Sequence, residues 1–547
     1  MPSPATHATP VSWPDDFPAT WTGCPRLPLP TLLAQATDTF GDRPVLLFDD
    51  GTALTGNDLR RHAERFAGYL ATVLQPGERV ALAMGNRAEY VTAYLAVIAN
   101  RAIVVSLSPE IGSHEAEFAV TDAHCVLAIA DDRSHQVLTA LRATGSTPLR
   151  DVITVGDNEP DGFAHLTADT IPLNFTDVDA ALEDLIDIGY TSGTTGLPKA
   201  LAGNHAETLR YIDVHLRLRR LHDDGPQRML MPLQLHYGDP LTWLFGAMCC
   251  GDSLVLMRRF SASRFWEVAR TTQATTILTI GSVPSMLLSQ PESPADRDHD
   301  IRSAIALAIP PQQHAELERR FGFSWTESYG SSESGPAIKM PLDVAAEFVG
   351  TGALGIPLPD VQARLIDEQG QLVEGPGTGE LELSGEILFS GYLDNPSATA
   401  EVLHDGWLRT GDLMRRDDRG VYYFLGRSKE VIRRSGINIA PTEVEAVLRQ
   451  HPDVVDAAVV PVPDAMMGEE IKAYVELTPK ATFDPRGLAD FCAERLSRHK
   501  VPRYIELRTT AFPRTPSQRI PKKQLMVDGM HRTTHAWDRA LDSEPAS

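Results

Sequence analysis

Short apolar runs alternate with amphipathic segments of helical period along much of the chain, and this alternation constrains the fold most strongly. Apolar residues recur at helical spacing over residues 59–74, and an apolar run at 79–84 follows between two glycines. The same order returns over residues 89–130 and again over 253–280. Helices that alternate with short buried strands are typical of domains built on parallel sheets. The sequence therefore predicts an α/β fold.

The character of the chain changes near residues 355 and 427. After residue 355, short alternating strands separated by Gly and Pro turns predict a β-rich subdomain. Beyond residue 427, helical and strand-like segments predict a compact α+β domain. Five prolines before residue 19 predict an irregular arm, and the last 20 or so residues show no clean period. We therefore predict an arm over 1–27, a large domain over 28–426, a small mobile C-terminal domain over 427–525 and a loosely held tail over 526–547.

The charge balance and the cysteine usage limit the expected partners and compartment. The chain has 50 Lys and Arg against 73 Asp and Glu, a formal net charge of −23 at pH 7. This excess repels phosphate polyanions, so we expect no nucleic-acid partner and no membrane partner. The five cysteines show no disulfide framework or metal-binding spacing, and no apolar stretch resembles a signal peptide or a membrane span. We therefore expect a cytoplasmic protein.

Residues 190–199 form the strongest local signal, a loop in which hydroxyl residues alternate with glycines. It has the sequence Tyr-Thr-Ser-Gly-Thr-Thr-Gly-Leu-Pro-Lys and follows a strand-like run at 185–189. Glycines let backbone N–H groups approach phosphate oxygens closely, while hydroxyls donate further hydrogen bonds and a lysine adds positive charge. Pro198 stands where a Walker loop requires its second glycine. The order predicts a phosphate-binding loop rather than a plain polar turn, with these residues as ligands: Thr191, Ser192, Gly193, Thr194, Thr195, Gly196 and Lys199.

This loop resembles the phosphate loop of the adenylate-forming superfamily, which includes acyl-CoA synthetases, luciferases and the adenylation domains of peptide synthetases. Residues 327–333, Glu-Ser-Tyr-Gly-Ser-Ser-Glu, resemble the family's Tyr-Gly-x-Thr-Glu segment, and residues 408–412, Leu-Arg-Thr-Gly-Asp, its Arg-Thr-Gly-Asp segment. Gly426-Arg427 and the later Ser435-Gly436-x-Asn438 resemble its interdomain segments. Because these motifs agree in order and span almost the whole chain, the chain is identified as a member.

The resemblance implies nucleotide-binding roles for residues of the middle motifs. Tyr329 would stack on adenine, Asp412 would accept hydrogen bonds from both ribose hydroxyls, and Arg427 would reach the ribose and phosphate. Ser332 stands where the family usually has threonine and would donate to the α-phosphate. Glu333 would hold Mg²⁺, a hard cation that binds carboxylate and phosphate oxygens together.

The same resemblance implies a swinging small domain and an acyl pocket. Lys429 would be the hinge about which the small domain turns between adenylate formation and transfer to a thiol. Gly436 would leave room for the pantetheine arm of coenzyme A. The acyl pocket would be lined by His236, Tyr237 and Gly281.

Three departures from the family pattern leave the acid substrate open. His236 stands where amino-acid-activating relatives commonly place an aspartate, which disfavours an α-amino acid, although Asp239 follows three positions later. Residues 306–310 depart from the usual glycine-rich stretch that contacts adenine. The C-terminal Pro-x-Thr-x-x-Gly-Lys segment becomes Pro-Arg-Thr-Pro-Ser-Gln-Arg, which ends at Arg519. Arg519 keeps the catalytic charge but is longer, planar and bidentate, so the anion that it holds need not be an ordinary carboxylate.

Taken together, the motifs imply an ATP- and Mg²⁺-dependent ligase. An acid anion would attack the α-phosphate, pyrophosphate would leave, and the acyl group would pass to a thiol, most simply coenzyme A. One alternative is an adenylating enzyme with another anion or acceptor, such as a diazotase that activates nitrite for an aryl amine, or an amide-forming ligase. Another is a non-catalytic nucleotide-binding homologue. Lys199, Glu333 and Asp412 argue against the last alternative, whereas Arg519 leaves room for it.

Overall fold

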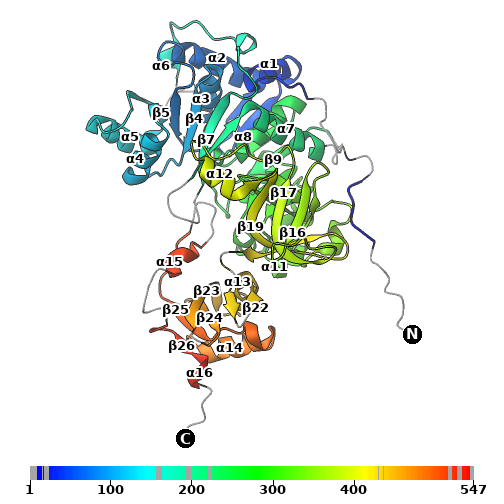
Figure 1. Cartoon of the computed structure of the whole chain (residues 1–547). Helices are drawn as coiled ribbons and strands as arrows, with labels where there is room; N and C mark the ends of the chain where they lie inside the picture. The colour runs from blue at the N-terminus through cyan, green and yellow to red at the C-terminus, as the bar shows by residue number, and fades with distance from the viewer. Residues whose placement is uncertain are drawn as a thin grey trace.

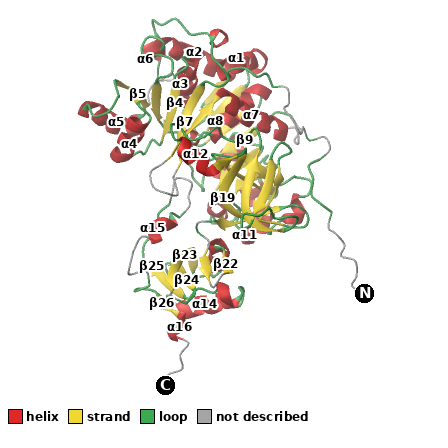
Figure 2. Ribbon diagram, viewed as in Figure 1, coloured by secondary structure: helices red, strands yellow, loops and turns green. Residues whose placement is uncertain are grey.

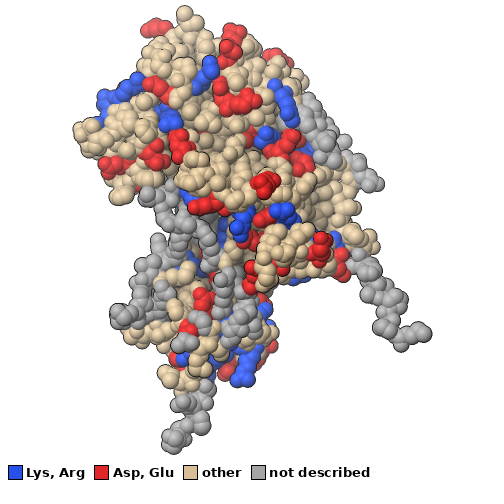
Figure 3. All heavy atoms as spheres, viewed as in Figure 1, with Lys and Arg blue, Asp and Glu red and all other residues tan. Residues whose placement is uncertain are grey.

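The computed structural model describes residues 9–14, 17, 24–155, 163–191, 199–219, 225–281, 283–428, 430, 432–434, 437–464, 466–514, 520–526 and 533–542. They form a large N-terminal domain of mixed α/β structure and a small α+β C-terminal domain (Figures 1 and 2). No helix in this described part is both long enough and apolar enough to cross a membrane. Acidic and basic side chains are interspersed over the face drawn in Figure 3.

The first sheet of the large domain confirms the predicted α/β alternation. Its strands lie in the order β6 (Asp151–Thr154), β5 (Cys125–Ala130), β3 (Arg79–Ala83), β4 (Ile103–Leu107), β7 (Leu185–Thr191) and β8 (Lys199–Asn204). All neighbours in this order pair in parallel except β7 and β8, which are antiparallel. The helices of this part of the chain are α2 (Gly56–Leu70), α3 (Ala88–Ala99), α4 (Ser113–Asp122), α5 (Asp132–Thr144) and α6 (Ala164–Thr167).

The second sheet joins a parallel half to an antiparallel half. The mostly parallel half contains β2 (Ala53–Thr55), β1 (Pro44–Phe48), β10 (Ser253–Leu256), β9 (Arg228–Met231), β11 (Thr276–Ile280), β12 (Ser303–Leu307) and β13 (Ser324–Ser331). The antiparallel half continues through β14 (Gly335–Lys339), β15 (Ala353–Pro357), β20 (Tyr422–Arg427), β19 (Trp407–Arg416), β17 (Gly377–Ser384) and β16 (Gln362–Ile366), with β18 (Leu403–His404) beside β19. The β-rich subdomain predicted after residue 355 belongs to this antiparallel half, which begins earlier, at β14, and continues the parallel strands directly.

An apolar layer between the two sheets forms the main core. Leu82 of the first sheet and Leu254 of the second belong to one buried cluster with side chains of α3. Because α3 is buried on almost every side, its sequence is apolar nearly throughout. Its Tyr94 hydroxyl donates to Asp187 Oδ2 at 2.7 Å, so these polar groups inside the layer are paired.

Further helices and short 3-10 turns complete the large domain. The helices are α1 (Leu29–Phe40), α7 (His205–Arg219), α8 (Asp239–Cys250), α9 (Phe265–Thr271), α10 (Val283–Leu288), α11 (Pro311–Phe321) and α12 (Pro396–Val402). The 3-10 turns are η1 (Phe175–Asp177), η2 (Leu235–Tyr237), η3 (Pro294–Arg297) and η4 (Ala345–Phe348). Helix α8 carries functional candidates at both of its ends, Asp239 and Cys250.

The described residues of the N-terminal arm contain no helix or strand and pack on the β-rich subdomain. Val11 N donates to Arg419 O at 3.0 Å, and Trp13 Nε1 donates to Pro357 O at 2.8 Å. The Trp13 ring also stacks on Phe17, with ring centres 4.5 Å apart. These contacts hold the described part of the arm against the β-rich subdomain.

The small domain has its own sheet and its own core. The strands lie in the order β22 (Ile437–Ile439), β21 (Ile432–Arg434), β24 (Gly468–Leu477), β25 (Tyr504–Arg508) and β26 (Trp537–Asp538), with β23 (Val454–Asp464) beside β24. Its helices are α13 (Pro441–Leu448), α14 (Pro485–Ala493), α15 (Lys522–Met526) and α16 (Arg539–Asp542), with the 3-10 turn η5 (Arg498–Lys500). Ile432, Val459 and Leu488 belong to a buried cluster separate from that of the large domain.

The prediction of a loosely held tail is wrong for residues 537–542. Strand β26 pairs antiparallel with β25, and Arg503 Nε donates to Asp538 Oδ1 at 3.0 Å. A two-residue strand fixed by a carboxylate and a guanidinium leaves no periodic pattern in the sequence. Periodicity therefore could not reveal that this segment adds an edge to the small sheet.

Candidate active site

Three of the predicted nucleotide-binding residues meet at one buried carboxylate. Tyr329 of β13 donates its hydroxyl hydrogen bond to Asp412 Oδ2 at 2.6 Å. Arg427 at the end of β20 faces Asp412 of β19 in the antiparallel register, and its Nε lies 2.9 Å from Asp412 Oδ1. Asp412 is only 2% exposed, so the guanidinium offsets the cost of burying its charge. The structure thus brings together three residues that separate motifs predicted.

Both oxygens of Asp412 already have partners, which refines its predicted role. A carboxylate offers about four acceptor sites on its two oxygens, so each oxygen retains capacity for a further hydrogen bond. Two ribose hydroxyls would have to use that remaining capacity. Burial and the charge of Asp412 raise the pKa of Tyr329 well above its ordinary value, so the phenol stays a neutral donor. Arg427 Nη1 donates to Thr410 O at 3.1 Å, which helps to fix the guanidinium.

Glu333 lies in the turn between β13 and β14, beside a tyrosine that the sequence analysis did not single out. The Tyr392 hydroxyl donates to Glu333 Oε1 at 3.0 Å, and Lys199 Nζ lies 4.7 Å from the centre of the same ring. Tyr392 therefore connects the phosphate-loop cation to the candidate metal ligand. Hydrogen bonds of the Glu333 backbone hold the turn, because Glu333 N donates to Ser331 Oγ at 3.2 Å and Phe389 N donates to Glu333 O at 2.9 Å.

The described part of the phosphate loop consists of its two ends. Thr191 and Lys199 are register partners across β7 and β8, so the loop leaves and rejoins the sheet at one place. Ser332 is exposed in the turn that carries Glu333. The remaining predicted site residues lie outside the described residues: Ser192, Gly193, Thr194, Thr195, Gly196, Lys429, Gly436 and Arg519.

The predicted acyl-pocket residues lie on two loops at one edge of the second sheet. His236 and Tyr237 occupy η2, with ring centres 4.3 Å apart, and η2 follows β9. Gly281 follows β11 with φ of 55°, and its N–H donates to Leu307 O at 3.0 Å. Because β9 and β11 pair in parallel, both loops leave the same edge. Burial lowers the pKa of His236 to about 4, so its ring is neutral at physiological pH.

Tyr211 of α7, a second residue that the sequence analysis did not single out, lies beside the start of β14, next to the Glu333 turn. A Cβ added at Gly335 would lie 3.2 Å from its ring. Burial raises the pKa of Tyr211, and the negative charges of surrounding carboxylates, with Asp239 first among them, raise it further. Asp239, the first residue of α8, has exposed surface, and burial of its carboxyl raises the pKa of that group to about 6.

The segment 306–310 contains a backbone conformation that favours glycine. Ala308 has φ of 87°, a conformation that residues with a side chain adopt at a cost. The next residue, Ile309, donates its N–H to Glu327 Oε2 at 3.2 Å, and burial raises the pKa of Glu327 to about 7. Ala308 therefore adopts a backbone conformation typical of glycine, and a buried carboxyl group holds the residue that follows it.

A large α/β domain that carries these loops, followed by a small C-terminal domain, is the organisation of adenylate-forming enzymes. Comparison with protein-family models agrees with this assignment. The AMP-binding enzyme model matches residues 33–393, and the AMP-binding enzyme C-terminal domain model matches residues 443–519. The chain therefore belongs to the AMP-binding enzyme family and is an ATP-dependent adenylate-forming ligase.

Similar proteins cover almost the whole chain. A sulfoacetate–CoA ligase from Cupriavidus necator is 32% identical over 510 residues, which are 91% of this chain and 97% of that protein. A crotonobetaine/carnitine–CoA ligase from Salmonella typhimurium is 29% identical over 89% of this chain and 96% of that protein. Among solved structures, ATP-bound MatB from Rhodopseudomonas palustris has a TM-score of 0.81 at 25% identity, over 93% of this chain and all of that one. The amide bond synthetase McbA from Marinactinospora thermotolerans has a TM-score of 0.78 at 25% identity, over 91% of this chain and 99% of that one.

Proposed function

We propose that the protein activates a carboxylic acid with ATP and transfers the acyl group to coenzyme A. The observation that carries the proposal is the cluster of Tyr329, Asp412 and Arg427. Glu333 follows Tyr329 within one strand and turn, so a nucleoside bound at Asp412 would direct its phosphates toward Glu333 and Lys199. The CoA ligases among the similar proteins support a thiol as the acceptor.

Glu333 fits the requirements of a Mg²⁺ ligand. Mg²⁺ prefers hard oxygen donors and usually binds one or two carboxylates together with substrate phosphates. Glu333 Oε1 accepts from Tyr392, and Oε2 has no hydrogen-bond donor among the described residues, which leaves this oxygen for an ion. When bound there, the ion would neutralise negative charge on the phosphates.

The first step would need no protein nucleophile. The substrate carboxylate attacks the α-phosphorus, a new O–P bond forms, and the bond to the pyrophosphate oxygen breaks. Lys199 would offset phosphate charge, Ser332 would donate to the α-phosphate, and Arg519 would hold the carboxylate beside it. Positioning and charge neutralisation are therefore what this chain would contribute to catalysis.

For the transfer step, we propose that the small domain rotates at Lys429 and that Gly436 leaves room for the pantetheine arm. The proposed domain boundaries remain 426/427 and 525/526. Polar contacts flank Lys429 in the described part of the chain: Ser428 N donates to Gly411 O at 2.8 Å, and Lys522 Nζ lies 3.5 Å from a Glu430 oxygen. Such contacts exchange readily with water, which suits a joint that moves between two arrangements.

Asp412→Asn is expected to weaken ATP binding about tenfold or more. The change removes the charge that Arg427 and a bound ribose share, and hydrogen bonds to a charged group contribute about 1.5–3 kcal/mol each. Calorimetric titration with ATP measures the effect. Glu386→Gln is the matched control, because this carboxylate lies on the same domain with a side chain 78% exposed. Equal ATP affinity in Asp412→Asn and the wild type would place the nucleotide elsewhere.

Asp239 leads us to propose a substrate acid that carries a cationic group. The residue has exposed surface and no cationic partner among the described residues, and burial of the carboxyl raises its pKa to about 6. A substrate cation would supply the missing partner and favour the ionised carboxylate. The carnitine–CoA ligase relative supports an acid of this class. The sulfoacetate–CoA ligase relative supports the alternative, an acid that carries a second negative group, and the two are distinguished by experiment.

The charge state of Asp239 predicts a pH dependence for such a substrate. The carboxyl is neutral below its pKa of about 6 and negative above it. KM for an acid with a trimethylammonium group is expected to fall about fivefold from pH 5 to pH 7, since a partly exposed ion pair contributes up to about 1 kcal/mol. Asp239→Asn should remove this fall, and a plain alkanoate should not show it in either protein. The same pH profile for both acids would contradict a role for Asp239 in cation binding.

An acid panel tests the proposed function as a whole. Pyrophosphate release is measured with a trimethylammonium acid, sulfoacetate, a short alkanoate and nitrite, with coenzyme A or an aryl amine added in turn. We expect release with a carboxylic acid and formation of its coenzyme A thioester. Release with nitrite alone, or products with amines alone, would replace the acyl-CoA ligase with another adenylating chemistry. No release with any acid would favour a non-catalytic homologue.

A further inference from the structure

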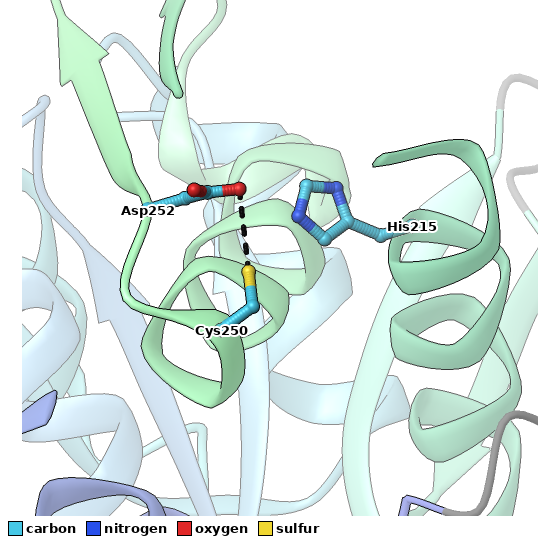
Figure 4. Close-up of side chains that lie close together, drawn as sticks. All are labelled: His215, Cys250 and Asp252. Carbon is cyan, nitrogen blue, oxygen red and sulfur yellow. Dashed lines mark hydrogen bonds between the residues drawn. The ribbon is translucent and has the colours of Figure 1, made fainter. Parts of the chain in front are cut away.

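A buried cluster of potential metal ligands lies at the opposite end of α8 from the acyl loops. His215 of α7, Cys250 at the end of α8 and Asp252 just before β10 point toward one another (Figure 4). One donor atom from each residue lies within 4.8 Å of the other two. Cys250 Sγ itself lies 3.3 Å from Asp252 Oδ2. A nitrogen, a sulfur and an oxygen therefore converge on one point.

The His215 ring has polar atoms that the surrounding protein leaves unsatisfied. The residue is 8% exposed, and neither ring nitrogen has a hydrogen-bond partner within the described ranges. The ring lies edge-on to Trp243 and over Gly246, where an added Cβ would lie 2.4 Å from His215 Cδ2. Buried polar groups almost always have a partner, so this ring position points to a ligand.

We propose that His215, Cys250 and Asp252 bind a divalent transition-metal ion, with Zn²⁺ best suited to the donor set. Zn²⁺ accepts imidazole nitrogen, thiolate sulfur and carboxylate oxygen in tetrahedral sites. The ion would bind between Cys250 Sγ and Asp252 Oδ2, and the thiol proton, which Gly246 O and Asp252 Oδ2 can both accept at 3.3 Å, would leave to solvent as the sulfur–metal bond forms. A small cavity lined by His215, Gln227, Trp243 and Asp252 lies beside the cluster.

Neighbouring groups already orient the Asp252 carboxylate. Gln227 N donates to Oδ1 at 2.8 Å, and Arg219 Nε donates to Oδ2 at 2.8 Å. Hydrogen bonds of this kind hold metal-ligating carboxylates in place. The Arg219 charge opposes a cation, but its side chain is one-fifth exposed, and the new Cys250 thiolate adds a compensating negative charge. The Asp252 carboxylate is thus held in place by groups that would not themselves bind the ion.

Its place in the fold indicates a structural role rather than a catalytic one. Helix α8 has 12 residues, so Cys250 lies about 16 Å along the helix from Asp239 at the acyl end. The ligands come from α7, the end of α8 and the turn into β10. A bound ion would therefore fasten α7 to the α8–β10 corner, and its effect should appear in stability and metal content.

The test uses the full-length chain after removal of metals with a chelator. Titration with Zn²⁺ alone should show one tightly bound ion per chain and a raised melting temperature. Titration with Co²⁺ alone should produce the ultraviolet charge-transfer band of a thiolate–cobalt bond. Cys250→Ala should abolish the band, and His215→Ala should lower Zn²⁺ affinity at least about 100-fold. Cys249→Ala, a change at the neighbouring thiol, should bind both metals as the wild type does.

A measurement on the wild type keeps the test independent of variant folding. Zn²⁺ should protect Cys250 from alkylation, as mapped by mass spectrometry, relative to the metal-free chain. If the wild type shows no charge-transfer band, the proposal is wrong, and a water in the cavity would be the hydrogen-bond partner of the His215 ring. So does a band lost with Cys249→Ala and kept with Cys250→Ala, or alkylation of Cys250 that Zn²⁺ does not slow.

Discussion

Glu333→Gln is expected to reduce pyrophosphate release about 100- to 1,000-fold at ordinary Mg²⁺ concentrations, the size of effect seen when one key electrostatic group is removed from a transition state. Glutamine preserves the shape of the side chain and can still accept from the Tyr392 hydroxyl, which lies 3.0 Å from Glu333 Oε1. It lacks only the charge that a hard cation requires. A rapid assay for pyrophosphate across a range of Mg²⁺ concentrations measures the loss.

Tyr392→Phe separates the charge of Glu333 from its orientation. This change removes the hydrogen bond to Glu333 but keeps the carboxylate and the ring beside Lys199. We expect about a tenfold loss of pyrophosphate release, since a hydrogen bond to a charged group contributes about 1.5 kcal/mol or more. Extra Mg²⁺ should recover part of the activity of Tyr392→Phe and little of that of Glu333→Gln. Full turnover in Glu333→Gln would remove this residue from the site.

Local patterns predicted most of the fold because the buried elements are clear apolar segments bounded by turn residues. Helix α3 and strand β5 lie in the core and consist of almost uninterrupted apolar residues, so they could be placed to within a residue or two. Strand β26 could not be placed, because two residues held by an ion pair have no period. The continuity of the β-rich subdomain with the parallel strands depends on the pairing of β14 and β15, which no local pattern encodes.

The candidate site was predictable residue by residue but not as a set of contacts. Tyr329 and Asp412 stand in motifs that point to nucleotide chemistry, yet their hydrogen bond is a product of the folded sheet. Tyr392 carries no motif and reaches the site only because its backbone pairs with Leu201 of β8. Tyr211 was likewise hidden, since one tyrosine on a helix has no distinguishing pattern.

The sequence also did not predict the buried cluster of metal ligands. The cysteines show none of the spacings typical of zinc sites, so the sequence predicted no metal at them. His215 comes from a helix well before Cys250 and Asp252 in the chain, and only the packing of α7 against α8 brings the three together. A site assembled from one ligand of each type leaves no sequence signature.

Arg519→Ala is expected to slow adenylate formation about 1,000-fold while leaving transfer from a supplied acyl adenylate nearly unchanged. The guanidinium would neutralise the substrate anion and the α-phosphate together, and that demand exists only before pyrophosphate leaves. Single-turnover assays of the two half-reactions separate the effects. Arg495→Ala is the matched control, because this small-domain arginine pairs with its neighbour Glu494. Equal loss in both half-reactions would make Arg519 a structural residue.

Arg519→Lys then tests whether the site needs only the positive charge of Arg519 or also the bidentate geometry of its guanidinium. Lysine keeps the charge but is a compact donor, whereas a guanidinium grips two oxygens in one plane. Restored adenylation of carboxylic acids in Arg519→Lys would mean that charge alone matters and that the ordinary ligase mechanism operates. Loss despite the retained charge would mean that bidentate geometry matters, and the acid panel would then show whether a carboxylate or nitrite fits it. Activity gained by Arg519→Lys over an inactive wild type would make the natural protein a nucleotide-binding homologue, because one side chain would separate it from catalysis.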